Sequence, residues 1–263
     1  MTNPQFTYYP GQVFFHGSIG RAMGTKFDVL ARGLSESVSS RIWDEICAMV
    51  RGDEAVFDRY SPESEVFAVN KALEAGTPVR ISEELEQAIV QSGLYRELTG
   101  GLFDITRRDF SALKFEDHCL SCSAADTKLD FGGFAKGWTL GRIVQLLRKE
   151  GVVSAFLDFG MSSIYAMGQH PAGAPWQVEL HSPYDGRLLE VFSLQDCALS
   201  ISGNSPSYSA HIVNPRSGEP VRSRMLCSVQ CADPLAAEVL STAAMVCGGK
   251  LEIEDTVIKS YEV

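Results

Sequence analysis

Residues 130–137, DFGGFAKG, form the strongest local candidate for chemistry in the sequence. Glycines that lead into a helix leave backbone amides and carbonyls open to a ligand, and Lys136, one turn further on, can reach an anion. The same residues could also form an ordinary glycine turn before a surface helix, which is the commoner structure for a short glycine pattern. Alone, the stretch indicates an anion site without establishing one.

His211 begins the second candidate, because the turn residues Asn214-Pro215 and Ser217-Gly218 follow it. We expect His211 to end a strand that enters a tight bend. An unperturbed imidazole has a pKa near ~6.5 and accepts a proton at neutral pH. A lone histidine is also often a hydrogen-bonded structural residue, so both interpretations stay open.

Glu238 and Thr242 form the third candidate, on a helix predicted to begin at Asp233-Pro234. Positions four apart lie on one helical face, so a carboxylate and a hydroxyl can face one site. Oxygen ligands of this kind suit Mg²⁺, which takes few protein ligands and completes its shell with phosphate and water. The alternative is a solvent-facing glutamate and a threonine bonded to its own helix.

Two other groups of metal-ligand residues give no site. Cys119 and Cys122 have CxxC spacing, but no second pair or Cys/His partner follows at zinc spacing. The remaining histidines are dispersed along the chain and indicate no metal cluster: His16, His118, His170 and His181.

The elements that must position these residues can be read from caps and periodicity. Helices are expected over 36–51 with Ser35 as N-cap, from Ser82 to the glycine pair at 100–101, after Gly133 to about Lys149, and from Asp233. Strands are expected over 153–158, 175–181 and 188–194. Because no regular βαβ rhythm links them, we predict an α+β fold of mixed sheets packed with helices.

Composition narrows the partners and the location. The 263 residues are 45% hydrophobic and carry a formal net charge of -10, which argues against nucleic acid as the main partner. No apolar run is long enough for an integral membrane segment, and no signal peptide is visible. Seven scattered cysteines favour a reducing compartment, so we expect a cytoplasmic protein, with export as the alternative if a leader is missing.

The three candidates occur in one order with three further motifs. The further motifs are residues 23–25 (MGT), 60–65 (YSPESE) leading to Asn70, and 101–106 (GLFDIT). This order resembles that of the ApbE family of FAD:protein FMN transferases, over residues 18 to 247. The resemblance implies a single domain of two intimate halves over 18–252, with an N-terminal extension at 1–17 and a C-terminal tail at 253–263.

The resemblance also implies a role for each matching position. The FAD pocket is expected at Met23, Tyr60, Leu102, Phe103, Asp104, Asp130, Lys136 and Ile212. Mg²⁺ is expected on the carbonyl of Gly133, with Glu238 and Thr242. His211 matches the family's histidine, the expected general base. The implied reaction attaches FMN from FAD to a Thr or Ser hydroxyl of an acceptor protein and releases AMP.

The chain departs from the family pattern at several positions. The family usually has Asp at the position of Glu238, and one extra methylene moves the carboxylate. Asn214 stands in place of an aspartate near the base, and Ile201 in place of a threonine hydroxyl near the flavin. The other departures are Trp138 followed by Gly141, Met161 after Gly160, and a short connection from Asp104 to Asp130.

These departures leave three functions to compare. The first is the Mg²⁺-dependent FMN transferase. The second is an FAD pyrophosphatase that uses water as acceptor at the same site and gives FMN and AMP. The third is a catalytically degenerate FAD-binding protein, favoured by Asn214, Ile201 and Gly141. Retention of His211, Lys136, Glu238 and Thr242 together favours the transferase.

Overall fold

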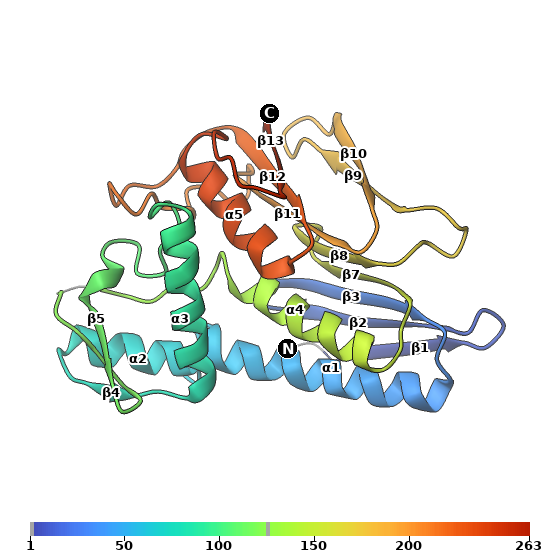
Figure 1. The fold of residues 1–263 in the computed structure, drawn as a ribbon, viewed down its shortest axis with the longest axis horizontal. Coiled ribbons are helices and arrows are strands. Elements are labelled where there is room, and N and C mark those ends of the chain that lie inside the picture. The colour runs from blue at the N-terminus through green and yellow to red at the C-terminus, as the bar shows by residue number, and fades with distance from the viewer. Residues whose placement is uncertain (1–2, 125–126) are drawn as a thin grey trace.

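The larger half of the molecule is built on an eight-stranded antiparallel sheet (Figure 1). The structure is a computed structural model and describes residues 3–124 and 127–263. Along the sheet the strands follow the order β1-β2-β3-β7-β8-β11-β12-β13. Their bounds are β1 Gln5–Tyr9, β2 Phe14–Ala22, β3 Thr25–Arg32, β7 Ser154–Phe159, β8 Ser163–Met167, β11 Cys197–Gly203, β12 Met225–Cys231 and β13 Val257–Glu262.

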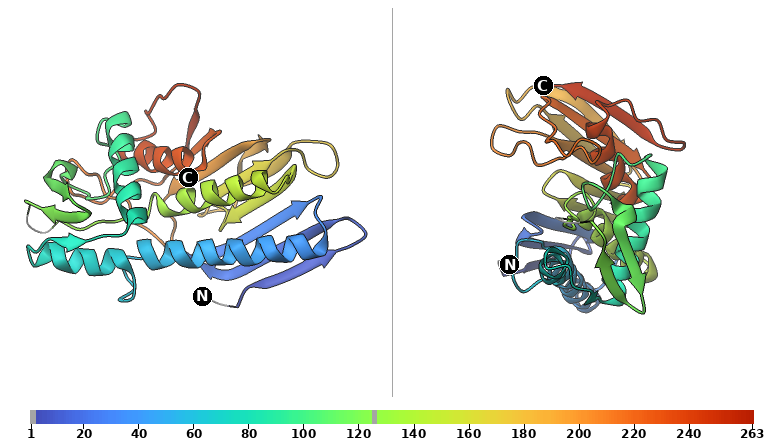
Figure 2. Two further views of the ribbon diagram at one scale, coloured as in Figure 1. Left: turned by 60° about the horizontal axis from the view of Figure 1, so that its bottom comes forward. Right: turned by 90° about the vertical axis from the view of Figure 1, so that its left-hand side faces the viewer.

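Three helices cover one face of this sheet, α1 Glu36–Phe57, α4 Ala135–Lys149 and α5 Pro234–Val246. Figure 2 shows α1 and α4 running side by side along it. Alternate residues of the central strands, such as Phe27, Val29 and Leu157, are fully buried beneath these helices. The opposite face is covered in part by the hairpin of β9 Trp176–His181 and β10 Leu188–Leu194.

The smaller half has a core of its own. It contains α2 Glu65–Glu74, α3 Glu83–Leu98, the 3-10 turn η1 Phe110–Ala112, and a small sheet of β4 Val79–Arg80, β5 Leu113–Glu116 and β6 Cys119–Cys122 in the order β4-β6-β5. Phe57 of α1, Phe134 before α4 and Val239 of α5 also belong to this second core. The two halves therefore share helices, and the predicted α+β fold is confirmed.

Residues at both chain ends take part in the main sheet. β1 pairs with β2 along one edge, and β13 pairs with β12 along the other. The boundaries at residues 17 and 252 stay a prediction, but the segments beyond them contribute strands to the same sheet. Within residues 3–124 and 127–263, no helix combines the length and hydropathy that a bilayer span requires.

The expected elements are found with local corrections. Ser82 and Asp233 cap α3 and α5 by accepting the amides of Leu85 and Leu235. Ser35 occupies the N-cap position of α1 but makes no side-chain cap bond, because its hydroxyl faces Ser37 at 3.3 Å. Helix α2, capped by Ser64, was not among the expected helices.

The strand expected to end at His211 is absent, because β11 has already ended at Gly203. His211 lies instead in an irregular segment just before the isolated bridge between Val213 and Pro220. The predicted tight bend does follow it, since the Gly218 amide donates to the Asn214 carbonyl at 2.8 Å.

Candidate active site

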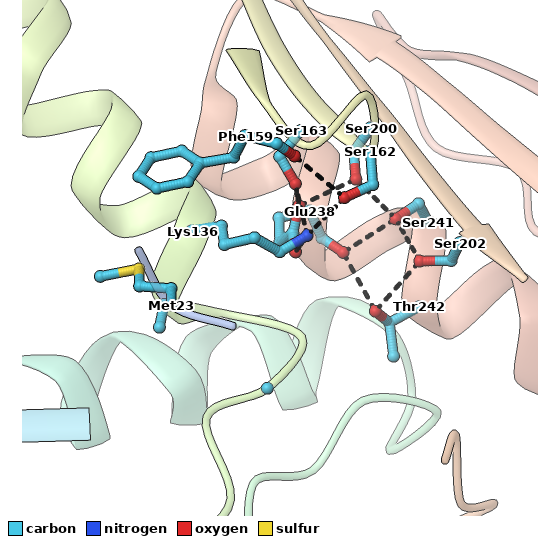
Figure 3. A network of polar contacts seen from close by, with 12 residues as sticks. Met23, Lys136, Phe159, Ser162, Ser163, Ser200, Ser202, Glu238, Ser241 and Thr242 are labelled. Atoms are coloured by element: carbon cyan, nitrogen blue, oxygen red, sulfur yellow. Dashed lines mark hydrogen bonds and ion pairs between the residues drawn. The ribbon is translucent and has the colours of Figure 1, made fainter. Parts of the chain in front are cut away.

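Lys136, in the first turn of α4, meets Glu238 of α5 in a largely buried ion pair (Figure 3). Lys136 Nζ lies 3.0 Å from Glu238 Oε1. The same ammonium donates to Ser162 Oγ at 2.8 Å and Ser163 Oγ at 2.7 Å, at the start of β8. The glycine turn, the α5 carboxylate and the sheet therefore meet at one point.

A network of serine hydroxyls continues from this ion pair beneath α5. Glu238 Oε2 accepts from the hydroxyls of Ser163 and Ser200. Ser200 also contacts Ser241 at 3.0 Å, and Ser241 contacts Ser202 at 2.8 Å. Sequence reasoning missed Ser163, Ser200 and Ser241, although Ser200 and Ser202 alternate along β11 and therefore face the same side.

Two glycines allow α4 and α5 to approach closely. A Cβ on Gly133 would lie 2.7 Å from Thr242 Oγ1, so any side chain there would occupy the space beside that hydroxyl. A Cβ on Gly137 would lie 2.7 Å from both the Pro234 carbonyl oxygen and Glu238 Cβ. The glycine pattern thus has a packing role as well as leaving backbone groups open.

The three residues expected to hold Mg²⁺ lie on neighbouring segments. Gly133 abuts Thr242, which lies one turn after Glu238 on α5. A carbonyl, a hydroxyl and a carboxylate suit Mg²⁺, which needs few protein ligands. The Glu238 carboxylate already contacts Lys136 and two serines. Its single negative charge would therefore be divided between Lys136 and a bound ion. In the described part of the chain, no group of three or more His, Cys, Asp or Glu residues is arranged for a metal.

The His211 imidazole is half-buried and stacks on Tyr208, with ring centroids 4.0 Å apart. Burial lowers the pKa of His211 below its ordinary value, and the positive charges of Arg107 and Lys136 lower it further, against the opposing charge of Asp130. Among the described residues, none hydrogen-bonds to the buried His211 Nδ1. The imidazole is therefore neutral at neutral pH and retains an unused polar atom.

Two arginines surround Asp130, the first residue of the glycine motif. Arg59 Nη1 lies 3.0 Å from Asp130 Oδ2, and Arg107 pairs with the same oxygen. Arg107 also donates to the His211 carbonyl oxygen at 3.2 Å. Sequence reasoning did not single out either arginine, since nothing in the local sequence pairs them with residue 130.

Two of the expected flavin residues, Tyr60 and Met23, lie in turns of the chain. Tyr60 is 74% exposed, and the Arg59 guanidinium lies over its ring at 4.6 Å. Met23 has a left-handed backbone, with φ of 49°, and its amide donates to Glu54 Oε1 at 2.6 Å. Its sulfur lies 3.7 Å from Thr139 Oγ1 on α4.

The other expected flavin residues make mainly protein contacts. Phe103 and Ile212 are buried in apolar clusters, and Leu102 packs against the smaller core. Asp104 accepts from Thr106 and from Arg96 Nε at 3.1 Å, which fixes the turn after α3. These contacts shape the loops, and a role of these four residues in flavin binding stays a prediction.

A family model and curated relatives both match this chain to one protein family. The model of the ApbE family matches residues 23–116 and 107–257. The FAD:protein FMN transferase of Haemophilus influenzae is 23% identical, over 89% of this chain and 81% of its own, and that of Treponema pallidum is 24% identical, over 78% and 71%.

Solved structures share the fold. The flavin transferase ApbE from Vibrio cholerae has a TM-score of 0.75 at 19% identity, covering 98% of this chain and 97% of its own. The apo form of the Pseudomonas stutzeri flavinyl transferase ApbE has a TM-score of 0.75 at 21% identity, covering 94% and 93%. At such identities the likeness concerns the arrangement of the chain.

Proposed function

Since this chain belongs to the ApbE family, we propose that it transfers FMN from FAD to a threonine or serine hydroxyl of an acceptor protein and releases AMP. One observation carries the proposal. The buried pair of Lys136 and Glu238 lies at a glycine turn that opens a helix, and the Lys136 ammonium is close enough to lower the pKa of the His211 imidazole. A cation within electrostatic reach of a neutral base supports the proposal.

The charges of this site suit a diphosphate. Transfer requires stabilisation of negative charge on the oxygens of both phosphates as the bond between them breaks. Lys136 supplies a cation at the start of α4, where exposed backbone amides also favour an anion. In a protein of net charge -10, such local cations matter because the overall field repels the substrate.

We propose that magnesium binds at the same place. The Gly133 carbonyl, the Glu238 carboxylate and the Thr242 hydroxyl would hold the ion, with phosphate and water as its other ligands. When bound, Mg²⁺ would supply Lewis-acid stabilisation of the phosphate oxygens.

His211 would serve as the general base. The acceptor hydroxyl gives its proton to the neutral imidazole as its oxygen forms a bond to the FMN phosphorus. The bond from that phosphorus to the bridging oxygen breaks, and its electron pair leaves with AMP. Because burial lowers the pKa of His211, the base is available without first losing a proton.

Flavin contacts are proposed for the residues of the surrounding loops. Met23, Tyr60 and Asp130 lie on three separate segments: Met23 contacts Thr139 of α4, Tyr60 lies under the Arg59 guanidinium, and the Asp130 charge acts on His211. Leu102, Phe103, Asp104 and Ile212 would shape the pocket through the loops that they hold. Tyr60, largely exposed, offers a free aromatic face for the isoalloxazine ring or the adenine.

The test is to incubate the protein with FAD, Mg²⁺ and a panel of carrier proteins that each bear one exposed threonine or serine. Transfer predicts AMP release matched by flavin that stays on a carrier after denaturation. AMP with free FMN instead would indicate an FAD pyrophosphatase. FAD binding without AMP across the panel would indicate a degenerate binder, and the proposal would be wrong.

A further inference from the structure

The Arg107 guanidinium connects the glycine motif to the segment that carries His211. It pairs with the Asp130 carboxylate in the glycine motif and donates to the His211 carbonyl oxygen at 3.2 Å. Arg107 itself lies on the loop after α3, so three segments distant in sequence meet at this side chain. The side chain is about one-third exposed, so these contacts hold it partly withdrawn from solvent.

The backbone on both sides of this contact is unfavourable for ordinary residues. Arg107 has φ of 57° and Ala210, the residue before His211, has φ of 59°. Side chains with a Cβ rarely adopt this left-handed region, and such strain persists only where surrounding contacts hold it. The Ala210 amide donates to Asn204 Oδ1 at 2.9 Å, and Arg107 donates to the carbonyl oxygen of the following residue, His211.

The charges around the imidazole favour its neutral form. Arg59 and Arg107 share the single carboxylate of Asp130, so this cluster carries one excess positive charge. Arg107 and Lys136 oppose protonation of His211, Asp130 favours it, and Tyr208 covers one face of the ring. Of the two cations, Arg107 contributes more to lowering the pKa.

We propose that Arg107 is a positioning residue for His211, which ties the backbone of the base to Asp130 and so fixes the imidazole beside the glycine turn. This inference rests on the proposed transfer reaction for its consequence in catalysis. Arg107 acts through His211 and through its charge, and takes no proton itself. Its removal should therefore change the protonation of His211 as well as the rate.

The test compares Arg107→Gln and Arg107→Lys with the matched control Arg108→Gln. Arg108 is exposed, and its side chain makes no polar contact among the described residues, so the control removes the same charge from the same loop. The first readout is the His211 pKa, measured by NMR titration and assigned with His211→Gln. The second is kcat and KM for FAD across pH 5–9.

We expect Arg107→Gln to raise the His211 pKa and to move the acid limb of the kcat profile upward, with kcat down about tenfold at pH 6 and KM for FAD nearly unchanged. Arg107→Lys should keep the pKa low because it keeps the charge, yet lose rate because it cannot hold Asp130 and the His211 carbonyl together. Arg108→Gln should match the wild type in both readouts.

An unchanged His211 pKa in Arg107→Gln, or an equal shift in Arg108→Gln, would overturn the inference. If Arg107→Gln does not fold, Arg107→Lys decides, because wild-type kcat in that variant would contradict the positioning role. The titration needs neither FAD nor an acceptor. A wild-type protein that transfers no FMN would therefore refute the proposed function separately from the link between Arg107 and His211.

Discussion

Lys136 Nζ lies 3.0 Å from Glu238 Oε1, so the only lysine of the glycine motif neutralises the only acid on α5. Both side chains are mostly withdrawn from solvent, at 19% and 5% exposure. The pair joins the start of α4 to the second turn of α5 and anchors the serine network below them. We therefore expect both the stability of the fold and the proposed chemistry to depend on these two residues.

Lys136→Met should destabilise the protein strongly, because it leaves the Glu238 carboxylate buried without a cation. Loss of one partner of a buried pair costs about 3–5 kcal/mol. Urea unfolding at pH 7 measures this change, and wild-type stability in Lys136→Met would contradict the described geometry.

The double variant Lys136→Met/Glu238→Gln separates the two roles of the pair. With the uncompensated charge gone, stability should return to within about 1–2 kcal/mol of the wild type, since a neutral amide still accepts from the serines. FMN transfer should stay lost. Recovery of transfer in the double variant would show that the pair serves folding alone.

Two glycines of α4 should respond oppositely to the same substitution. Gly137→Ala places a Cβ 2.7 Å from the Pro234 carbonyl oxygen and 2.9 Å from Leu235 Cα, which are backbone atoms that cannot move aside freely. We expect a loss of about 1–3 kcal/mol. Gly141→Ala meets nothing within 4 Å and should gain up to about 1 kcal/mol through helix propensity. Thermal unfolding of both variants checks the difference, and equal effects would contradict the close helix contact.

Features set by local chemistry were predictable from the sequence. Ser82 and Asp233 cap their helices as expected because a cap needs only its own next few residues. The strand order was not predictable, since β3 pairs with β7 across more than a hundred residues. The strand expected before His211 was wrong because turn residues mark where a bend lies and not what precedes it.

His211 should make the free energy of unfolding fall as the pH drops below 6.5. Burial and neighbouring cations lower its pKa from the ordinary 6.5, so the folded protein holds this imidazole neutral where the unfolded chain protonates it. Stability from this group is complete above pH 6.5 and is lost as pH falls through the folded pKa. His211→Gln should lack that loss in urea unfolding between pH 7 and 5.

The same variant also tests the role of His211 as a base. Transfer should fall about 10²–10⁴-fold in His211→Gln, the usual contribution of a general base. FAD binding, followed by fluorescence, should remain. Unchanged turnover with FAD still bound would exclude His211 as the base and favour a degenerate binder.

Arg142→Met should destabilise the protein more at high pH than at low pH. Asp53 is fully buried against Arg142 and accepts from Thr139 Oγ1 at 2.6 Å, and burial raises the pKa of Asp53 to about 7. Without the cation, the ionised carboxylate should cost about 3–5 kcal/mol at pH 8. At pH 5 the cost should shrink because Asp53 takes up a proton.

The matched control is Glu84→Gln, which removes the more exposed partner of Arg142. Its effect should stay within about 1 kcal/mol at both pH values. Urea midpoints at pH 5 and pH 8 measure all three proteins. An equal penalty for Arg142→Met at both values would contradict a buried, proton-accepting Asp53.

Only part of the site could be predicted. Gly133, Lys136, Glu238 and Thr242 come together because their helices are packed against each other, and their motifs carry the resemblance to known proteins. Arg107 could not be predicted, because its partners depend on how far a long side chain reaches across three loops.

The most direct measurement is a crystal structure of the protein with FAD and Mg²⁺. The expected result is a diphosphate between the His211 imidazole on one side and Lys136, Glu238 and Thr242 on the other, with the metal on the Gly133 carbonyl. A diphosphate bound away from His211, or a metal held by other residues, would contradict it.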